Sequence, residues 1–336
     1  MTITGIALTR AVLTDCVRSA TKAPSLHNSQ PWLFRIHGSV IDVYADPGRR
    51  LQVLDPDGRE QLISVGAAVF TLRLALRQAG YGSEVAIFPT PGDADLVARV
   101  RLTQPATVTP TVEALAAAIP HRHTNRWPFA RTPVPADVLD HLRDAARWED
   151  AVLAVAGPDG RDAVLAMARA ADRRVRGRPG YRTELARWAG DTVRHDGVPS
   201  WAFGGWDALE TVPIRDFAEV SASPRPGEAF EAHPTILVLA TAGDRRSDWV
   251  RAGQALQRVL LAATWKGLSA TPISQPVEVP AVRRLLIDPS AGLTVQMVLR
   301  VGYGRTAGRT PRRPLSDVLL AHPNASRAGV TGPRRG

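Results

Sequence analysis

Ala23-Pro24-Ser25-Leu26-His27-Asn28-Ser29-Gln30-Pro31-Trp32 connects a segment with helical periodicity to one with strand alternation. Pro24 ends the amphipathic helix expected over 9–22, because proline lacks an amide donor and disfavours helical backbone in the residue before it. The short polar side chains that follow are Ser25, Asn28, Ser29 and Gln30. Such a loop suits a polar, planar ligand. Composition alone favours the alternative, a helix-to-strand connector whose polar groups cap the helix and satisfy the turn.

Outward from this loop, hydrophobic periodicity predicts many short helices and strands. The expected helices cover 9–22, 59–79, 111–119, 135–146, 161–175, 182–193, 247–265 and 315–320. The expected strands cover 33–37, 40–44, 84–88, 96–102, 151–156, 235–240 and 294–301. Helices 59–79 and 247–265 are apolar nearly all round, so each should be buried on most faces.

The two apolar helices align without gaps at an offset of 187 residues. The aligned pairs are Gly66 with Gly253, Ala68 with Ala255, and Gly80 with Gly267. Self-similarity at a fixed offset indicates a duplicated unit. The alternative is that two buried helices resemble each other because both use small and aliphatic residues.

Composition restricts the possible partners. The chain has 336 residues, of which 44% are hydrophobic and 22% charged, enough for a sizeable core. The net charge of +10 is carried almost wholly by arginine, in a chain rich in Ala, Val and Gly. We interpret this as a composition bias, since no block of like charges stands out. We therefore expect no nucleic-acid partner.

Cysteine and histidine usage argues against metal and disulfide chemistry. Cys16 is the only cysteine, so neither an internal disulfide nor a cysteine-based zinc site can form. The histidines lack metal spacing with carboxylates, and no Gly-x-Gly-x-x-Gly motif opens a helix after a strand. The N-terminus has no signal-peptide pattern, and no apolar run is long enough to span a membrane. We expect a cytoplasmic protein without a membrane partner.

The order of residues 23–32 closely resembles the loop with which flavin-dependent nitroreductases hold FMN. In that family the serine and the asparagine contact the flavin from the neighbouring subunit. The resemblance assigns these roles to Ser25 and Asn28, with Pro24 and Gln30 in the same motif. The closest resemblance is to the Acg-like single-chain nitroreductase homologues of actinobacteria, and it extends over essentially the whole chain before the tail.

Two further segments resemble the phosphate-binding elements of the family. Arg122-His123-Thr124-Asn125-Arg126 resembles the Arg-x-Ser-x-Arg/Lys segment that grips the FMN phosphate and ribityl chain, and Thr124 keeps the hydroxyl. Arg312-Arg313-Pro314 resembles the closing Arg-x-Pro, although Thr310 replaces a common lysine and puts one phosphate contact in doubt. A phosphate favours several guanidinium donors whatever the ancestry. Taken singly, each arginine is typical of a solvated surface.

Nitroreductases are usually homodimers with long central helices at the two-fold axis, so the resemblance implies that this duplicated chain mimics the dimer. The expected fold is α+β, with mixed or antiparallel sheets flanked by helices and two buried central helices. The expected parts are a first repeat at 1–110, a second repeat at 111–323 and a flexible tail at 324–336. Only the first repeat has the Pro-Ser loop and only the second has the arginine segment, so we expect one FMN per chain and a monomer.

Two other regions are candidates for the site. By the resemblance, Ser274 and Gln275 lie in a loop whose backbone amides face the reactive edge of the flavin; an ordinary polar turn at a strand end is an equal alternative. Residues 194–228 are the expected lid. Its aromatic residues are Trp201, Phe203, Trp206 and Phe217. They would seal the flavin or, alternatively, anchor a loop to the core.

Three functions remain open at this point. The first is an FMN-dependent oxidoreductase that takes electrons from NADH or NADPH, bound transiently, and passes them to a nitro, quinone or other small acceptor. The second is an FMN-binding or sequestering protein with a covered flavin and little turnover. The third is a flavin-dependent dehydrogenase of natural-product biosynthesis. No feature requires a catalytic side chain, because the flavin would perform the hydride chemistry.

Overall fold

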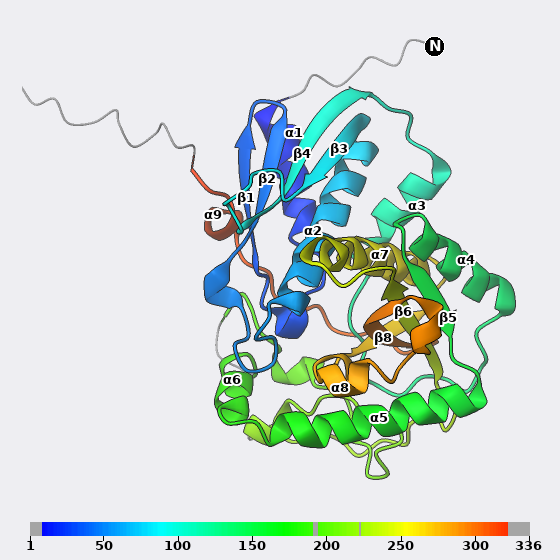
Figure 1. The fold of residues 1–336 in the computed structure, drawn as a ribbon. Helices are drawn as coiled ribbons and strands as arrows, with labels where there is room; N and C mark the ends of the chain where they lie inside the picture. The colour runs from blue at the N-terminus through cyan, green and yellow to red at the C-terminus, as the bar shows by residue number, and fades with distance from the viewer. Residues whose placement is uncertain (1–8, 191–193, 222, 322–336) are drawn as a thin grey trace, which may run out of the picture.

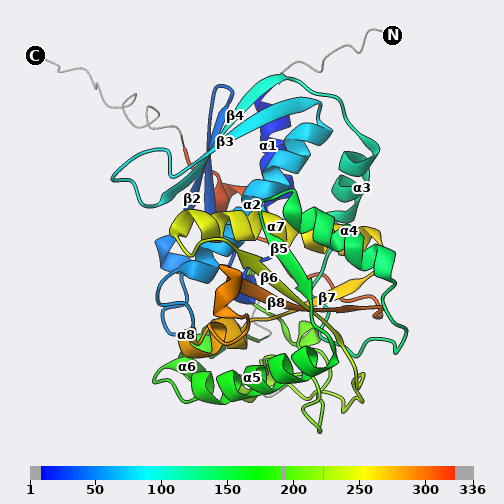
Figure 2. The same cartoon turned by 45° about the vertical axis from the view of Figure 1, so that its right-hand side comes forward.

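The computed structural model describes residues 9–190, 194–221 and 223–321. Two four-stranded antiparallel sheets lie on opposite sides of two long helices, α2 (Arg59–Gln78) and α7 (Arg246–Trp265), as Figures 1 and 2 show. The α+β class and the two central helices are confirmed, and both sheets are antiparallel. The expected flexible tail at 324–336 lies outside the described residues.

The first sheet is built from residues that precede and follow α2. Its strands are β1 (Trp32–His37), β2 (Val40–Ala45), β3 (Tyr81–Ile87) and β4 (Leu96–Pro105), in the spatial order β1-β2-β4-β3. Strand β1 alternates between buried and half-buried residues, as a strand with one covered face should. Helices α1 (Arg10–Ala20) and α2 cover that face and form one apolar core with it.

The second sheet repeats the same arrangement around α7. Its strands are β5 (Val152–Val155), β6 (Thr235–Thr241), β7 (Ser269–Ile273) and β8 (Thr294–Gly302), in the order β5-β6-β8-β7. Helix α4 (Ala136–Arg147) precedes β5 as α1 precedes β1. The order of elements and the pairing of strands are therefore the same in both halves, which supports duplication over chance similarity of two helices.

The matched glycines have matching structural roles. A Cβ atom on Gly66 would overlap the carbonyl of Val250, and one on Gly253 would overlap the carbonyl of Ile63, so the two backbones touch where α2 and α7 cross. Gly80 and Gly267 follow the ends of the helices with φ of +87° and +74°, a conformation that favours glycine. The offset of 187 residues thus relates equivalent positions in space.

The second half also contains elements without a counterpart in the first. Residues 156–234 lie between β5 and β6, whereas only residues 38–39 separate β1 from β2. This insertion contains α5 (Pro158–Arg176), which covers the face of the second sheet opposite α7, and α6 (Tyr181–Arg187). Helix α6 is shorter than the expected 182–193, whose last residues lie outside the described part.

Three short elements complete the described chain. Helix α3 (Pro110–Ala118) leads from the first half to the second, and α8 (Pro280–Arg283), which the periodicity did not predict, lies between β7 and β8. After α9 (Leu315–Val318), Leu319 forms a parallel bridge with Phe34, so the end of the second half returns to β1. None of the helices in the described ranges is both long and apolar enough to cross a membrane.

Candidate functional site

The loop between α1 and β1 is tightly wound and held by its own side chains. Three non-glycine residues have left-handed backbone, namely His27 (φ 50°), Asn28 (φ 54°) and Gln30 (φ 51°). Such conformations are uncommon and persist where the surroundings determine them strongly. The hydroxyl of Ser25 accepts the backbone amide of Gln30 at 2.9 Å. The sequence therefore builds a defined, polar turn here rather than a loose connector.

This loop forms one wall of a cavity between the two halves. The first half contributes Pro24, Ser25, Leu26, His27, Glu60, Ile63, Ser64 and Ala67, and the second contributes Thr124, Arg126, Ile214, Arg215, Phe217, Leu256, Leu260, Pro272, Ser274, Gln275 and Met297. A smaller cavity shares Pro24, Ser25, Thr124 and Arg126 with it. The two cavities are thus ends of one site, and the loop near residue 25 lies beside the arginine segment near residue 124.

The smaller cavity is lined by cations without carboxylate partners. It contains Arg122 and Arg312 in addition to Arg126. Within the described residues no carboxylate pairs with these three guanidinium groups, and Arg122 donates only to the backbone carbonyl of Lys22, at 3.3 Å. Buried charges are normally paired. This end of the site therefore has the chemistry of an anion site.

Burial and mutual repulsion change the ionisation of these groups. Burial, together with the nearby Arg312, lowers the pKa of Arg122 to about 9. Burial also lowers the pKa of Arg126 and of Arg312 to about 10. The neighbouring His123 has its pKa lowered to about 4 by burial and by Arg122 and Arg312, so its imidazole is neutral near pH 7. A bound dianion would offset the repulsion between Arg122 and Arg312.

Thr310 and Asn28 position Arg312. Its guanidinium donates to the Thr310 hydroxyl at 2.7 Å and to the Asn28 side-chain oxygen at 2.9 Å. The amide nitrogen of Asn28 donates to the carbonyls of Gly197 and Pro311, at 2.9 and 3.1 Å. Asn28 lines the smaller cavity. Its side-chain hydrogen bonds, however, join the loop to the insertion and to the C-terminal segment.

Gln30 and Arg313 line neither cavity. The Gln30 side chain donates to the His195 carbonyl at 2.8 Å and accepts the Arg313 amide at 2.9 Å. The Arg313 guanidinium donates to the carbonyls of Gln30 and Asp317. These two residues fasten neighbouring segments together, so the structure places them behind the site rather than in it.

Ser274 and Gln275 follow β7 and lie at the wall of the larger cavity. The side-chain amide of Gln275 donates to the Pro213 carbonyl at 3.2 Å, and Arg215 approaches the Ser274 hydroxyl at 3.5 Å. Both contacts are to residues 194–228. The predicted lid is therefore in contact with the segment that was expected to face the reactive edge of a flavin.

The four aromatic residues of the predicted lid have different roles. Phe217 lines the larger cavity, lies edge-on to His27 with ring centroids 4.9 Å apart, and packs under the Arg126 guanidinium. Phe203 stacks behind Phe217 at 5.9 Å. Trp201 and Trp206 are 58% and 51% exposed and line neither of these cavities. Only one of the four aromatic residues thus reaches the site.

Two charged residues of the cavity wall escaped the sequence analysis. Glu60 lies in the first turn of α2, and Arg215 comes from the insertion; both are buried. Arg59-Glu60 opening an otherwise apolar helix is the one sequence signal that could have drawn attention to Glu60. Arg215 could not be found in this way, because nothing local distinguishes it from the many surface arginines.

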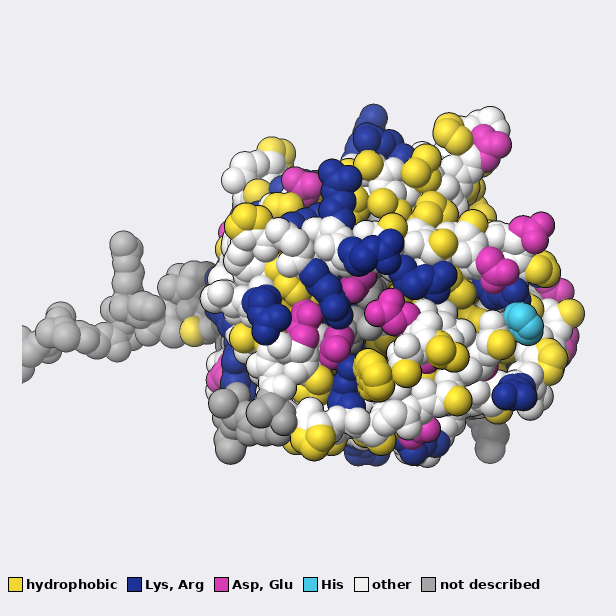
Figure 3. Space-filling model, turned by 90° about the horizontal axis from the view of Figure 1, so that it is seen from below, with side chains coloured by type: hydrophobic (Ala, Val, Ile, Leu, Met, Phe, Trp, Pro, Cys, Tyr) yellow, Lys and Arg dark blue, Asp and Glu magenta, His cyan; other side chains and the backbone are white. Residues whose placement is uncertain are grey.

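The outer surface offers less chemical definition than the cavity. On the face seen in Figure 3, basic and acidic side chains lie interspersed rather than forming a continuous basic surface. Within that view no single charge dominates. The charge feature that stands out in the described chain is the arginine cluster of the smaller cavity.

The chain is similar to several known proteins. The model of the nitroreductase family matches residues 119–303. A Mycobacterium tuberculosis H37Rv protein provisionally named NAD(P)H nitroreductase Rv3131 is 35% identical, over 92% of this chain and 90% of its own. Another from the same organism, provisionally named NAD(P)H nitroreductase acg, is 31% identical over 93% of this chain and 96% of its own. Among solved structures, the FMN-dependent nitroreductase NfnB from Mycobacterium smegmatis in complex with NADPH is 17% identical, with coverage of 62% of this chain and 98% of that chain and a TM-score of 0.39.

Proposed function

Because the chain belongs to the nitroreductase family, we propose that it binds one FMN where its two repeats meet and is an oxidoreductase that passes electrons from NAD(P)H to a small acceptor. The observation that carries this proposal is the set of largely buried, unpaired arginines at one end of a cavity whose other end is mostly apolar. FMN has the same division, with a phosphate at one end and a planar ring at the other. Bound FMN supplies the hydride chemistry.

The phosphate would lie in the smaller cavity. Arg122 and Arg312 would donate to it, and Thr124 would add a hydroxyl. Charge-assisted hydrogen bonds of this kind are about twice as strong as neutral ones, and several guanidinium groups match a dianion. Thr310 stands where the family commonly has lysine, and its contribution here is to orient Arg312. Asn28 would act in the same way, by holding Arg312 rather than the ligand.

The ring would occupy part of the larger cavity, between apolar side chains of both central helices and the lid, and the acceptor would lie beside it in the same cavity. Ile63 comes from α2, Leu256 and Leu260 come from α7, and Phe217 closes the side towards the insertion. Ser274 and Gln275 would lie at the reactive edge, where a backbone donor stabilises the negative charge that grows on a reduced ring. We further propose that residues 1–110 and 111–323 are the two repeats, each supplying one part of a single site.

The alternative function, FMN binding with little turnover, is favoured by the way residues 194–228 are fastened. Arg215 forms a buried ion pair with Glu278, with nitrogen-to-oxygen distances of 2.5 and 2.6 Å. Further hydrogen bonds tie the segment to the loop and to Arg126. A lid held in this way would keep NAD(P)H and large acceptors away from the ring unless it opens.

One experiment separates these functions. The purified protein is first assayed for bound flavin, and one equivalent per chain is expected; none, or two, would contradict the proposed site. The flavin-loaded protein is then mixed with NADPH or NADH under nitrogen. Rapid bleaching of the flavin absorbance indicates a reductase with an opening lid. Persistent colour, together with bleaching by the much smaller dithionite ion, indicates the sequestering protein.

A further inference from the structure

The larger cavity contains three buried polar side chains with unused hydrogen-bonding capacity. Within the described chain, Oε2 of Glu60, one terminal nitrogen of Arg215, and both ring nitrogens of His27 have no partner. All three residues are at least 95% buried and line the same cavity, although they come from α2, the insertion and the loop. Buried polar groups are generally satisfied, so several unsatisfied ones facing one cavity indicate a ligand with polar atoms.

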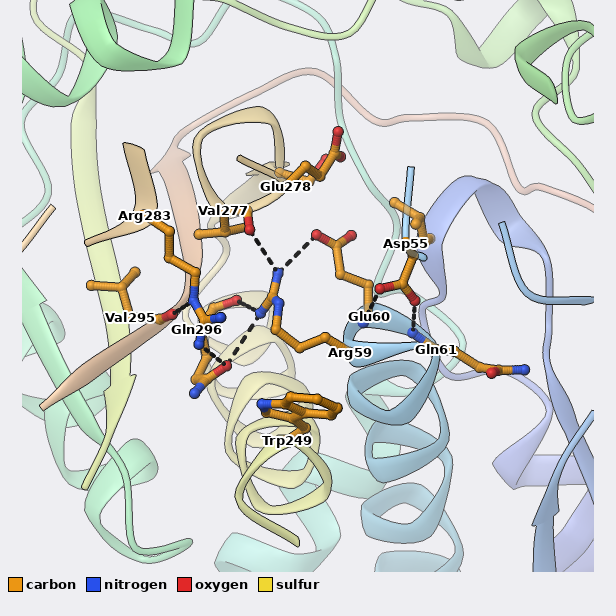
Figure 4. Close-up of polar contacts among 12 residues, drawn as sticks. Asp55, Arg59, Glu60, Gln61, Trp249, Val277, Glu278, Arg283, Val295 and Gln296 are labelled. Carbon is orange, nitrogen blue, oxygen red and sulfur yellow. Dashed lines mark hydrogen bonds and ion pairs between the residues drawn. The ribbon is translucent and has the colours of Figure 1, made fainter. Parts of the chain in front are cut away.

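Glu60 is held in place by groups that leave one of its oxygens free. Its backbone amide donates to Asp55 at 3.0 Å, and its Oε1 accepts from Arg59 at 2.9 Å. Arg59 also donates to the backbone carbonyl of Gln296 at 2.7 Å, so its guanidinium is shared (Figure 4). The Oε2 atom of Glu60 is therefore the part of this network that remains available to a molecule in the cavity.

The charges around Glu60 favour its protonated form. Asp55 precedes α2, and Glu278 follows β7; both are acidic neighbours, shown near Glu60 in Figure 4. Of the nearby arginines, Arg215 is committed to Glu278 and Arg59 is shared with Gln296. Burial, followed by repulsion from Glu278, raises the pKa of Glu60 to about 8. Near neutral pH these surroundings therefore favour the protonated carboxyl group over the carboxylate.

The other side chains of the cavity cannot take this role. His27 faces Arg215 and Arg126 as well as Phe217, and burial and these two cations lower its pKa well below the usual value, so the acidic imidazolium form is disfavoured near neutral pH. The Ser64 hydroxyl already donates to the Glu60 carbonyl at 2.7 Å. Among the described residues that line the cavity, Glu60 is the acid whose proton is available.

We propose that Glu60 is the proton donor to the electron acceptor, through a hydrogen bond from its carboxyl group to an acceptor oxygen. The inference rests on the proposed function, which supplies the reductant. Two-electron reduction of a planar acceptor with a quinone-type oxygen needs one hydride and one proton. Reduced FMN provides the hydride and is oxidised, while the O–H bond of Glu60 breaks and its proton forms an O–H bond on the acceptor. Glu60 is left as a carboxylate, which water reprotonates.

The test uses Glu60→Gln, which keeps size and hydrogen bonding but carries no acidic proton. The flavin-loaded protein is reduced with dithionite, and its reoxidation is followed by stopped flow with two acceptors. The quinone menadione takes a hydride and a proton, whereas ferricyanide takes single electrons and no proton. We expect Glu60→Gln to slow reoxidation by menadione about 100-fold, a typical contribution of general acid catalysis, and to leave reoxidation by ferricyanide within about twofold of the wild type.

The matched control is Glu149→Gln. Glu149 is also a buried carboxylate held by arginines, Arg73 and Arg258, but it lines neither cavity of the site. The Glu149→Gln substitution should leave both reoxidation rates unchanged. A second readout does not depend on turnover: the infrared band of a protonated carboxyl group should disappear as pH rises through about 8 in the wild type. That change should be absent in Glu60→Gln and present in Glu149→Gln.

The outcomes distinguish this inference from the proposed function. A protein that binds no FMN contradicts the proposed function itself. A protein that binds FMN, with Glu60→Gln reacting with menadione as fast as the wild type, overturns only the role of Glu60. Equal slowing with menadione and ferricyanide also overturns it, because a purely structural defect would affect both acceptors. The role of Glu60 is also overturned if ferricyanide reoxidises the reduced wild-type protein but menadione does not.

Discussion

The first repeat joins β1 to β2 with residues 38–39, whereas the second repeat inserts residues 156–234 between the equivalent strands β5 and β6. At the connection before the first strand of each half, the longer segment belongs to the first half instead. Residues 21–31, between α1 and β1, form the Pro-Ser loop, whereas only residues 148–151 join α4 to β5. Two halves with the same topology therefore differ at their connections, and each has a part that the other lacks.

The difference extends to the central helices. Leu260 of α7 lines the larger cavity, and the offset of 187 residues relates it to Arg73 of α2. Arg73 donates to Glu149 at 2.7 Å and to Gln254 at 2.8 Å. An apolar wall at one position thus corresponds to an ion-paired arginine at the other. The comparison fits our proposal that the core of one unit occurs twice in this chain and its site once.

The largest effect should come from disturbing what the repeats share. Gly253→Ala places a methyl group against the Ile63 carbonyl where α2 and α7 cross, and α7 cannot move away without repacking both cores. We expect a loss of about 3 kcal/mol in the free energy of unfolding, measured by urea denaturation. Gly160→Ala in α5 is the control, since its Cβ meets only ordinary contacts; it should be neutral or slightly stabilising. Equal stability of both variants would show that the crossing tolerates a side chain.

The next effect concerns a part that only the second repeat has. Arg122→Ala should raise the Kd for FMN about 10- to 100-fold, because it removes a charge-assisted hydrogen bond worth about 1.5–3 kcal/mol. Titration of the apoprotein, followed by quenching of FMN fluorescence, measures the change. Arg101→Ala, at an exposed arginine of the first sheet, should bind as the wild type does. An unchanged Kd in Arg122→Ala would place the phosphate elsewhere.

A smaller effect should depend on pH. His123 has its pKa lowered to about 4 in the folded state, so between its ordinary value of 6.5 and 4 the unfolded chain binds a proton that the folded chain does not. The folded protein therefore loses no stability through His123 above pH 6.5, and its free energy of unfolding decreases as pH falls from 6.5 towards 4. Between pH 7 and pH 5, the free energy of unfolding should fall by roughly 1 kcal/mol less in His123→Gln than in the wild type. The effect is this small because the side chain is partly exposed.

Urea denaturation of the apoprotein at the two pH values checks this prediction. His233→Gln, at an exposed position of the same repeat, is the control and should follow the wild type. The prediction would be contradicted if the free energy of unfolding fell between pH 7 and pH 5 by no more in the wild type than in His123→Gln.

The smallest effect should separate the aromatic residues of the insertion. Phe217→Leu loosens the wall of the larger cavity at a cost below about 1.5 kcal/mol. Dithionite should then reduce the bound flavin faster than in the wild type. Trp201→Ala should change neither the rate nor the stability, because this side chain is mostly exposed. If Trp201→Ala gave the faster reduction, the lid would be formed by a different part of the insertion from the one inferred here.

Local chemistry explains which features the sequence could predict. Pro24 and Gly80 mark helix ends through backbone effects that need no tertiary context, and the central helices are recognisable from their apolar faces. Strand β7 contains Pro272 one residue before its end, and periodicity does not predict it as a strand. Its place at the edge of the second sheet makes the missing amide tolerable.

The site was predictable only in part, for a related reason. Ser25, Thr124 and Arg122 belong to ordered motifs, so their proximity followed from the resemblance. The direction of a side chain in an irregular segment did not: Phe217 faces the cavity and Trp206 faces solvent, although both are aromatic residues of one insertion. Glu60 and Arg215 acquire much of their importance from Glu278, which is distant from both in sequence.

The contact between Asn28 and Arg312 has a consequence for biosynthesis. Chains leave the ribosome from the N-terminus, and their parts begin to fold in that order. The Pro-Ser loop is made early, but the guanidinium that it positions is added near the end, with the segment that returns to β1. A nascent chain can thus complete the strands of its first sheet long before it has every part of the proposed site, so in this proposal flavin would be acquired after release rather than during translation.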